Sequence, residues 1–454
     1  MILAGSLIAI FFIAVVARLL IKNYYAHAVL LISGLLMLGI ASILGFEMPK
    51  LDKPTGSAFF DIFEYITIAF SQTNANVGLM IMAIGGFVAF IDKIGASDAL
   101  VYLAMKPLSL LKKYPYIIAS LVIPIGQFLF ICIPSAAGLA LLLMASIFPI
   151  MVNLGVSRLS AASVITACTA FGVGPASVIT ARSVKIIETN SVSHFFGSQI
   201  PLMIPLTIAL MITYYFVNKY YDKKMKVEVT TVETKEIELK VPVFYAIIPV
   251  LPLIILLVFS DLFQFFETPI HVNTTMVMIF CVFVGLVFEA VRTRDVKVVF
   301  NSLKLFFNGM GDIFKSVVTL IIAAEIFSKG LISLMFIDGL ISSSQSLGLG
   351  ADGISIVMAL MIFLASILMG SGNAAFFAFG PLVPKLTGEL AVSTTHMILP
   401  MEFAASMGRT VSPISGVLLS TSEIAKVSPF DIAKRNAIPF VVALLVMLIH
   451  HFIL

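Results

Sequence analysis

The sequence predicts an all-α polytopic membrane protein built from two inverted-topology repeats. Of the 454 residues, 60% are hydrophobic and only 11% are charged, and the mean hydropathy is +1.10. A soluble chain has roughly a quarter charged residues, so this chain has too little charge to cover a surface in water. Several apolar stretches reach the roughly 20 residues that a bilayer crossing needs. Runs of Gly, Ser and Pro interrupt these stretches at related places in the two halves.

Composition also excludes other classes. Three cysteines, Cys132, Cys168 and Cys281, are too few and odd in number for a secreted disulfide scaffold, and we interpret them as small apolar residues in membrane segments. The net charge is only +4, and no basic run alternates with aromatic residues, so no nucleic-acid partner is expected. The six histidines show no ligand spacing, so neither a metal nor a cofactor is predicted.

We expect about ten to twelve elements that cross or enter the bilayer. The first has no charged n-region and no clear cleavage site, and it is therefore interpreted as a retained span. The clearest candidates are residues 2–20, 26–46, 78–91, 201–218, 241–260, 272–288 and 437–454.

A charged segment divides the chain near its middle. Residues 219–240 carry four lysines at their start, which places the segment in the cytoplasm by the positive-inside rule. Arg18 and Lys22 place the end of the first span in the cytoplasm as well. The first span therefore runs inward and the first span after the loop runs outward. This predicts that the membrane repeats 1–218 and 241–454 have opposite orientations.

Short motifs support the repeat. The sequence SAAG at 135–138 corresponds to SGNA at 371–374, and PAS at 175–177 corresponds to PIS at 413–415. The two pairs have similar spacings along the chain. Inverted repeats are common in secondary transporters, whose substrate sites lie at the repeat interface near the midplane.

Four breaks in apolar segments are the most informative features. They predict re-entrant hairpins near 134–153 and 370–385 and broken helices near 169–181 and 406–420. Half-helix N-termini at such breaks suit a carboxylate, and freed carbonyls suit a cation such as sodium. The alternative is that the Gly, Ser and Pro runs only permit close helix packing or kinks. Their recurrence in both halves favours a binding function.

One cation lies inside a predicted broken helix. Arg409 could form a bidentate pair with a substrate carboxylate. The alternative is that it pairs with Glu402 or extends to the membrane interface.

Other charges within apolar segments have more ordinary interpretations. Glu325 could carry a proton, but we favour a pair with Lys329 one helical turn later. Arg182 and Lys185 are interpreted as an interfacial flank, although Arg182 could be a second anchor for an anion.

Six motifs are suited to comparison with known families. They are PSAAGLALLLMASIFPIMVN at 134–153, YYDKK at 220–224, GSGNA at 370–374, PK at 384–385, GRTVSPISG at 408–416 and SPF at 428–430. In this order, over essentially the whole chain, they resemble the anaerobic C4-dicarboxylate carriers of the DcuC type. The resemblance implies a carrier of succinate, fumarate and malate in the bacterial inner membrane. It also implies the ion-transporter superfamily fold, with paired hairpins, a scaffold domain that forms a homodimer, and an elevator-like transport domain.

The sequence therefore predicts a secondary transporter that moves a small dicarboxylate by exchange or proton symport. Its alternative is a sodium- or proton-coupled carrier of another small organic anion or an amino acid. A channel is disfavoured because the chain has no ring of like charge, and an ATP-driven enzyme because it has no phosphate-binding loop. The expected substrate-binding residues are Ser135, Gly138, Ser177, Thr180, Ser371, Gly372, Asn373, Arg409, Thr410, Ser412, Pro413 and Ser415.

Overall fold

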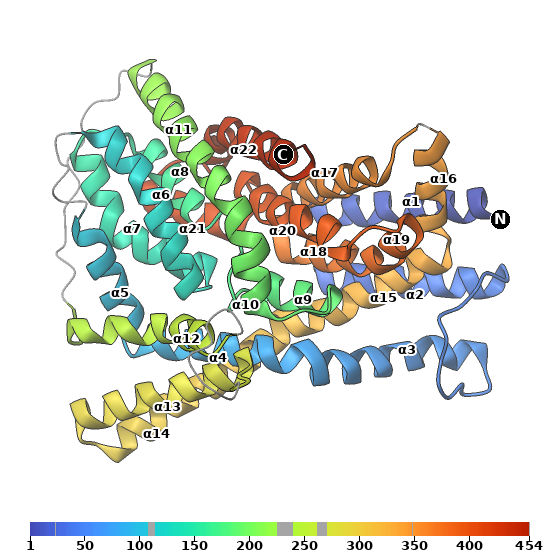
Figure 1. Cartoon of the computed structure of the whole chain (residues 1–454), viewed down its shortest axis with the longest axis horizontal. Helices are drawn as coiled ribbons and strands as arrows, with labels where there is room; N and C mark the ends of the chain where they lie inside the picture. Colours follow the sequence, from blue (N-terminus) through green and yellow to red (C-terminus); the bar gives the residue numbers. More distant parts are fainter. Residues whose placement is uncertain (23, 108–113, 225–238, 261–269, 347, 454) are drawn as a thin grey trace.

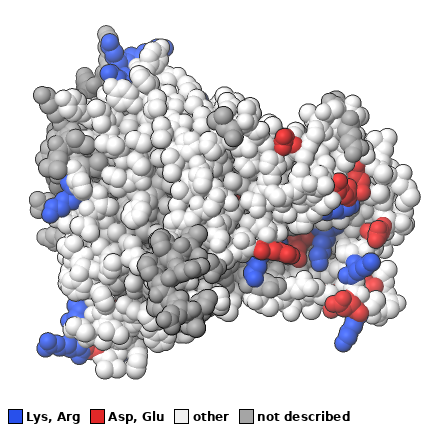
Figure 2. Space-filling model, viewed as in Figure 1, with Lys and Arg blue, Asp and Glu red and all other residues white. Residues whose placement is uncertain are grey.

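The computed structural model in Figure 1 describes residues 1–22, 24–107, 114–224, 239–260, 270–346 and 348–453. These residues form helices and no strand, which confirms the predicted all-α class. Nine helices in the described part are long and apolar enough to cross a membrane, or ten if the bent pair α4–α5 forms one span. Figure 2 shows a broad uncharged area over the left and centre of the view, with basic side chains along its margin and a mixed group of acidic and basic side chains on the right-hand part. Such a surface suits a bilayer.

The described part of the first half contains eleven α-helices, and two of its long helices pass through a π-helical turn. The elements are α1 (Ile2–Ile21), α2 (Ala26–Ile43), α3 (Ala58–Thr73), a π turn (Asn74–Gly78), α4 (Leu79–Lys93), α5 (Ala96–Met105), α6 (Pro115–Cys132), α7 (Ala136–Asn153), α8 (Arg158–Cys168), α9 (Val178–Ile186), α10 (Ser191–His194), a second π turn (Phe195–Gln199) and α11 (Ile200–Lys224).

The second half repeats this order of elements. It contains a 3-10 turn (Val243–Ala246), α12 (Ile247–Val258), α13 (Thr274–Thr293), α14 (Val296–Ile313), a π turn (Phe314–Val318), α15 (Thr319–Ser333), α16 (Phe336–Ser346), α17 (Ala351–Met369), α18 (Gly372–Phe379), a 3-10 turn (Gly380–Leu382), α19 (Val383–Leu390), α20 (Thr394–Val411), α21 (Gly416–Ala425) and α22 (Pro429–Phe452). Each half thus has a long helix with a π turn, a helix pair with a short break, a broken helix and a long last helix. The opposite orientation of the halves stays a prediction.

The helix pairs break where Gly, Ser and Pro interrupt the apolar runs. Ser135 caps α7 by accepting a hydrogen bond from the N–H of Gly138 at 3.2 Å, and Ser371 caps α18 by accepting one from Ala374 at 3.2 Å. The first break therefore lies between α6 and α7, and the second between α17 and α18–α19; the two helices beside each break are its first and second arm. The segment predicted as a hairpin near 134–153 is only the break and the second arm, because α6 already forms the first arm.

One predicted boundary is wrong. The charged loop was placed from residue 219, but α11 continues to Lys224. The reason is a buried polar cluster around Asp222, which is only 3% exposed. Its carboxylate accepts hydrogen bonds from the hydroxyls of Ser157 at 2.8 Å and Ser160 at 2.7 Å, and from Arg435 at 3.1 Å. Of the predicted loop, residues 225–238 lie outside the described residues.

The two halves are interleaved. Helix α4 packs along α13 and α14, whereas α15 packs along α2 and α3. The second arm of each helix pair also contacts the broken helix of the other half, α7 with α21 and α18 with α9. Neither half therefore has a core made only of its own helices.

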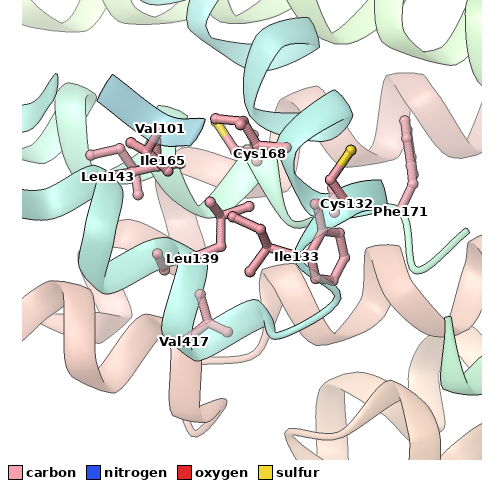
Figure 3. Close-up of a cluster of buried hydrophobic side chains, with 14 of the residues drawn as sticks. Val101, Cys132, Ile133, Leu139, Leu143, Ile165, Cys168, Phe171 and Val417 are labelled. Carbon is pink, nitrogen blue, oxygen red and sulfur yellow. The ribbon is translucent and has the colours of Figure 1, made fainter. Parts of the chain in front are cut away.

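An apolar cluster supports the first break. Figure 3 shows Ile133 at the break together with Leu139 of α7, Cys168 of α8 and Val417 of α21. These four side chains are buried, and Ile133, Leu139 and Cys168 have no exposed surface. As predicted, the three cysteines are free and buried among apolar residues. The break is therefore held by packing from both halves of the chain.

Candidate substrate site

A cavity of about 180 Å³ lies where the two breaks of the helix pairs meet α9 and α20. A cavity of this size holds several water molecules, which suits a small organic molecule. Among the described residues, the wall contains one charged side chain, Arg409, and no acid. The cavity is lined by Phe130, Pro134, Ala136, Gly172, Val173, Ser177, Val178, Ile179, Gly372, Asn373, Ser406 and Arg409.

Arg409 lies near the end of α20 and reaches the first broken helix. Its Nη2 donates a hydrogen bond to the backbone carbonyl of Thr169, at the C-terminal end of α8, and its guanidinium lies 6.0 Å from the centre of the Phe130 ring. A cation at a helix C-terminus offsets the negative end of the helix dipole. The guanidinium has five N–H donors, so others stay available to an anion in the cavity. The suggested pair with Glu402 is wrong, because Glu402 binds other residues.

Three helix N-termini face the cavity, those of α7, α9 and α18, since Ala136, Val178 and Asn373 line it. The first N–H groups of a helix have no partner within that helix and carry a partial positive charge. The N-terminus of α9 has no side-chain cap, because the hydroxyl of Ser177 instead donates to the carbonyl of Gly172 at 2.5 Å. Its donors therefore add to the positive potential of the cavity.

Contacts between the two halves shape the cavity wall. The N–H of Gly172 donates to the hydroxyl of Ser406 at 3.1 Å, which joins the first broken helix to α20. Gly372, at the N-terminus of α18, lies directly on α20. A Cβ added there would be 2.5 Å from the carbonyl oxygen of Ala405, so the second break needs glycine to approach this closely.

The cavity includes some of the predicted site residues. Ser177, Gly372, Asn373 and Arg409 line it. Sequence reasoning did not select the apolar lining residues, for which it offered no signal, although Gly172 and Ser406 lie in the segments predicted to break. The other predicted residues do not line the cavity; they are Ser135, Gly138, Thr180, Ser371, Thr410, Ser412, Pro413 and Ser415.

Several of these hydroxyls have structural partners instead. The hydroxyl of Ser412 donates to the carbonyl of Ile367 at 2.6 Å, and that of Thr410 donates to the carbonyl of Ser406 at 3.0 Å. The hydroxyl of Thr180 accepts a hydrogen bond from Gln199 at 2.9 Å. These residues hold the broken helices in place around the cavity.

The favoured interpretation of Glu325 is also wrong. Its carboxylate lies 3.5 Å from the guanidinium of Arg182 on α9, and both side chains are largely buried. Lys329 instead lies over the ring of Tyr65 at 5.6 Å. Arg182 therefore points inward and is not part of an interfacial flank, whereas Lys185 is exposed. The ion pair joins α9 to α15 of the other half.

A helical membrane fold with a cavity between broken helices is the arrangement expected of a multi-pass membrane transporter. Comparison with known proteins gives the family. The DcuC family, described as C4-dicarboxylate anaerobic carriers, matches residues 4–454, and the chain belongs to it. The chain is therefore a carrier and not an enzyme, and it resides in the bacterial inner membrane.

Relatives match over nearly the full length. The anaerobic C4-dicarboxylate transporter DcuC of Escherichia coli K12 is 34% identical over 444 residues, covering 98% of this chain and 95% of the relative. A probable anaerobic C4-dicarboxylate transporter DcuC of Vibrio cholerae is 32% identical over 443 residues, covering 96% and 94%.

Two solved transporters share the fold. The YdaH transporter of Alcanivorax borkumensis has a TM-score of 0.57 at 12% identity, covering 94% of this chain and 98% of the other. MtrF of Neisseria gonorrhoeae, from a class of antimetabolite efflux pumps, has a TM-score of 0.60 at 12% identity, covering 95% and 96%. At this identity the likeness supports the fold alone.

Proposed function

We propose that this chain is a secondary active transporter that moves C4-dicarboxylates such as succinate, fumarate and malate. The observation that carries the proposal is the charge of the cavity wall. Arg409 and three helix N-termini face the cavity, and none of its described lining residues is acidic. Such a wall favours an anion. Membership of the C4-dicarboxylate carrier family supports the same cargo.

A dicarboxylate fits this arrangement with its two ends bound differently. One carboxylate would pair with Arg409, whose planar guanidinium can donate two parallel hydrogen bonds. The other would accept hydrogen bonds from the N-termini of α9 and α18 and from the amide of Asn373. The apolar carbons would contact Phe130 and Val173. A monocarboxylate would leave one of these two groups without a partner.

Transport would follow from movement of the cavity between the two sides of the membrane. The elements around the cavity, the helix pairs and the broken helices, would form the transport domain of an elevator, and the remaining helices a scaffold that forms a homodimer. Carriers with this plan move a largely rigid unit around a fixed site. The protein would work by exchange or by symport with a cation, H⁺ or Na⁺.

Counterflow in proteoliposomes tests the proposal. Vesicles loaded with unlabelled succinate should take up labelled succinate, and external fumarate and malate should block this uptake. The measurement is repeated with and without a sodium gradient to test coupling to sodium. Absence of succinate counterflow from folded protein would refute the dicarboxylate assignment. A thermal-shift screen with other organic anions and amino acids would then identify the alternative cargo.

A further inference from the structure

A fully buried acid and a buried histidine lie behind the cavity. Nε2 of His194, at the end of α10, is 3.0 and 3.1 Å from the two carboxylate oxygens of Glu402 in the middle of α20. The side chains are 1% and 0% exposed. An ionised carboxylate in such a place is costly unless it is paired and hydrogen-bonded, so an unneeded pair here would only destabilise the protein.

The pair is connected to the cavity wall through one amide. Nε2 of Gln199 donates to Glu402 at 2.9 Å, and Oε1 of Gln199 accepts from the N–H of Gly174 at 3.0 Å. Gly174 follows Val173, which lines the cavity. Glu402 also precedes the lining residue Ser406 by about one turn of α20. A change at Glu402 therefore reaches both broken helices.

Within the described structure, His194 is the one ionisable group facing Glu402. The charges on the helices packed against α20 have partners or face outward. On α9, Arg182 pairs with Glu325 and Lys185 is exposed. Three further pairs hold the other charged groups of this region: Asp352 of α17 with His396, Lys385 of α19 with Asp338 and Glu389, and Arg435 of α22 with Asp222. His451 of α22 stacks on His396, and His450, Asp431 and Lys434 of α22 have exposed surface.

Nδ1, the second ring nitrogen of His194, is a position at which the pair could accept one more proton. Nδ1 is buried and has no hydrogen-bond partner in the described structure. When neutral His194 donates from Nε2 to ionised Glu402, Nδ1 is a bare acceptor and the pair carries a charge of −1. One added proton makes the pair neutral, either as an ion pair or as two neutral groups. The two side chains thus offer a buried place for one proton.

We propose that the His194–Glu402 pair is the proton-binding site that couples proton movement to anion transport. This rests on the proposed function and specifies its coupling ion. Arg409 lies seven residues after Glu402, or ~10 Å along the helix at ~1.5 Å per residue. With the pair at −1, Arg409 balances its charge. Entry of a dianion upsets this balance, and one proton on the pair reduces the excess negative charge. Proton and substrate then cross together and leave together.

Proteoliposome experiments separate coupling from substrate binding. In the wild-type protein, a pH gradient should drive accumulation of labelled succinate, and added succinate should carry protons inward, as reported by a trapped pH-sensitive dye. Glu402→Gln should lower the pH-driven accumulation and the proton entry at least tenfold. Counterflow at equal pH should stay within twofold, because glutamine keeps the shape of the side chain and its contact with Gln199. His194→Gln should act the same way. Glu423→Gln, at an exposed position on α21, is the matched control and should leave both readouts unchanged.

Each alternative result has a definite meaning. Proton entry that persists in Glu402→Gln overturns the proposal. A wild-type protein that catalyses counterflow, yet carries no proton inward when succinate is added to vesicles without internal succinate, overturns it as well. Loss of counterflow together with proton entry in both variants also overturns it, because a purely structural role gives that result. If the wild-type protein shows no succinate counterflow, the proposed cargo fails, and infrared difference spectra between acid and alkaline buffer still test the site. A buried carboxyl band that is lost in Glu402→Gln but kept in Glu423→Gln supports the site, and an unchanged band refutes it.

Discussion

The two broken helices are similar in sequence, but only the break of the first contributes several residues to the cavity. In α8–α9 the break spans residues 169–177, contributes Gly172, Val173 and Ser177 to the cavity, and leaves the N-terminus of α9 without a side-chain cap. In α20–α21 the break spans residues 412–415, and both of its terminal serines are engaged. Ser412 donates to Ile367, and Ser415 caps α21 by accepting from Leu418 at 3.4 Å. A break can bind a ligand when it leaves backbone N–H donors free. A break whose polar groups are hydrogen-bonded within the protein only connects two helices.

The largest expected effect is at Arg409, through which the second broken helix supplies charge to the first. Arg409→Ala should lower labelled-succinate counterflow by roughly 10- to 100-fold, because a charge-assisted hydrogen bond contributes about 1.5–3 kcal/mol. Arg409→Lys should recover part of the rate, since lysine keeps the charge but not the bidentate geometry. Arg18→Ala, at an exposed position on α1, is the control. Undiminished counterflow in folded Arg409→Ala protein would remove the proposed role.

Alanine substitutions of the glycines at the N-termini of α18 and α21 test whether only α18 needs a close approach to its neighbouring helix. Gly372→Ala would place a Cβ 2.5 Å from the carbonyl oxygen of Ala405, and overpacking of this kind costs about 1–3 kcal/mol. We expect a lower unfolding temperature and counterflow reduced at least fivefold. Gly416→Ala, at the start of α21, meets nothing within 4 Å and should stabilise the protein by about 0.4–1 kcal/mol. Equal tolerance at the two positions would contradict the packing described for α18.

The serines that precede α9 and α21 separate binding from stability. Ser177→Ala removes the hydrogen bond to the carbonyl of Gly172, and both residues line the cavity. Because this bond shapes the wall, we expect the binding free energy of succinate to weaken by about 1 kcal/mol, which raises KM roughly fivefold. Ser415→Ala removes a helix cap and should cost about 1 kcal/mol of stability. Its KM should not change. Transport kinetics together with thermal unfolding of both variants measure the contrast, and a KM effect at Ser415 would argue against it.

The smallest expected effect concerns the tether of α9 to α15. A double-mutant cycle with Arg182→Gln and Glu325→Gln should give a coupling energy of about 1 kcal/mol, because the pair is largely buried but separated by 3.5 Å. Thermal unfolding of the four proteins supplies the energies. The single variants should each be less stable than the double variant, since each leaves one buried charge unpaired. Strict additivity of the two substitutions would show that the tether contributes nothing.

Local signals in the sequence were sufficient to locate the breaks. Proline removes a backbone donor and glycine weakens a helix, so the interruptions near residues 134, 174, 372 and 413 could be predicted from a few neighbouring residues. Long apolar runs were likewise sufficient for the membrane class. These features depend on residues close together in the chain.

The partners across the fold could not be predicted in this way. Glu325 was assigned to Lys329 four residues away, but its partner Arg182 lies 143 residues away, and His194 and Glu402 are 208 residues apart. Phe130 and Val173 line the cavity without any motif, because only the packing of α6 and α8–α9 brings them there. Ser412 and Ser415 were predicted to bind substrate because their motif matches the one around Ser177. Sequence similarity does not reveal that the second break uses these serines for hydrogen bonds within the protein.

The interleaving of the two halves has a consequence for how the protein is made. Helix α2 leaves the ribosome early, but α15, along which it packs, is synthesised only after more than half of the chain. During that interval the polar backbone of the first breaks lacks its final neighbours, including α21 beside the first break. We therefore expect the first half to complete its folding only after the second half is made. A chain that stops after α11 would expose surfaces that are normally buried, and membrane proteases would degrade it.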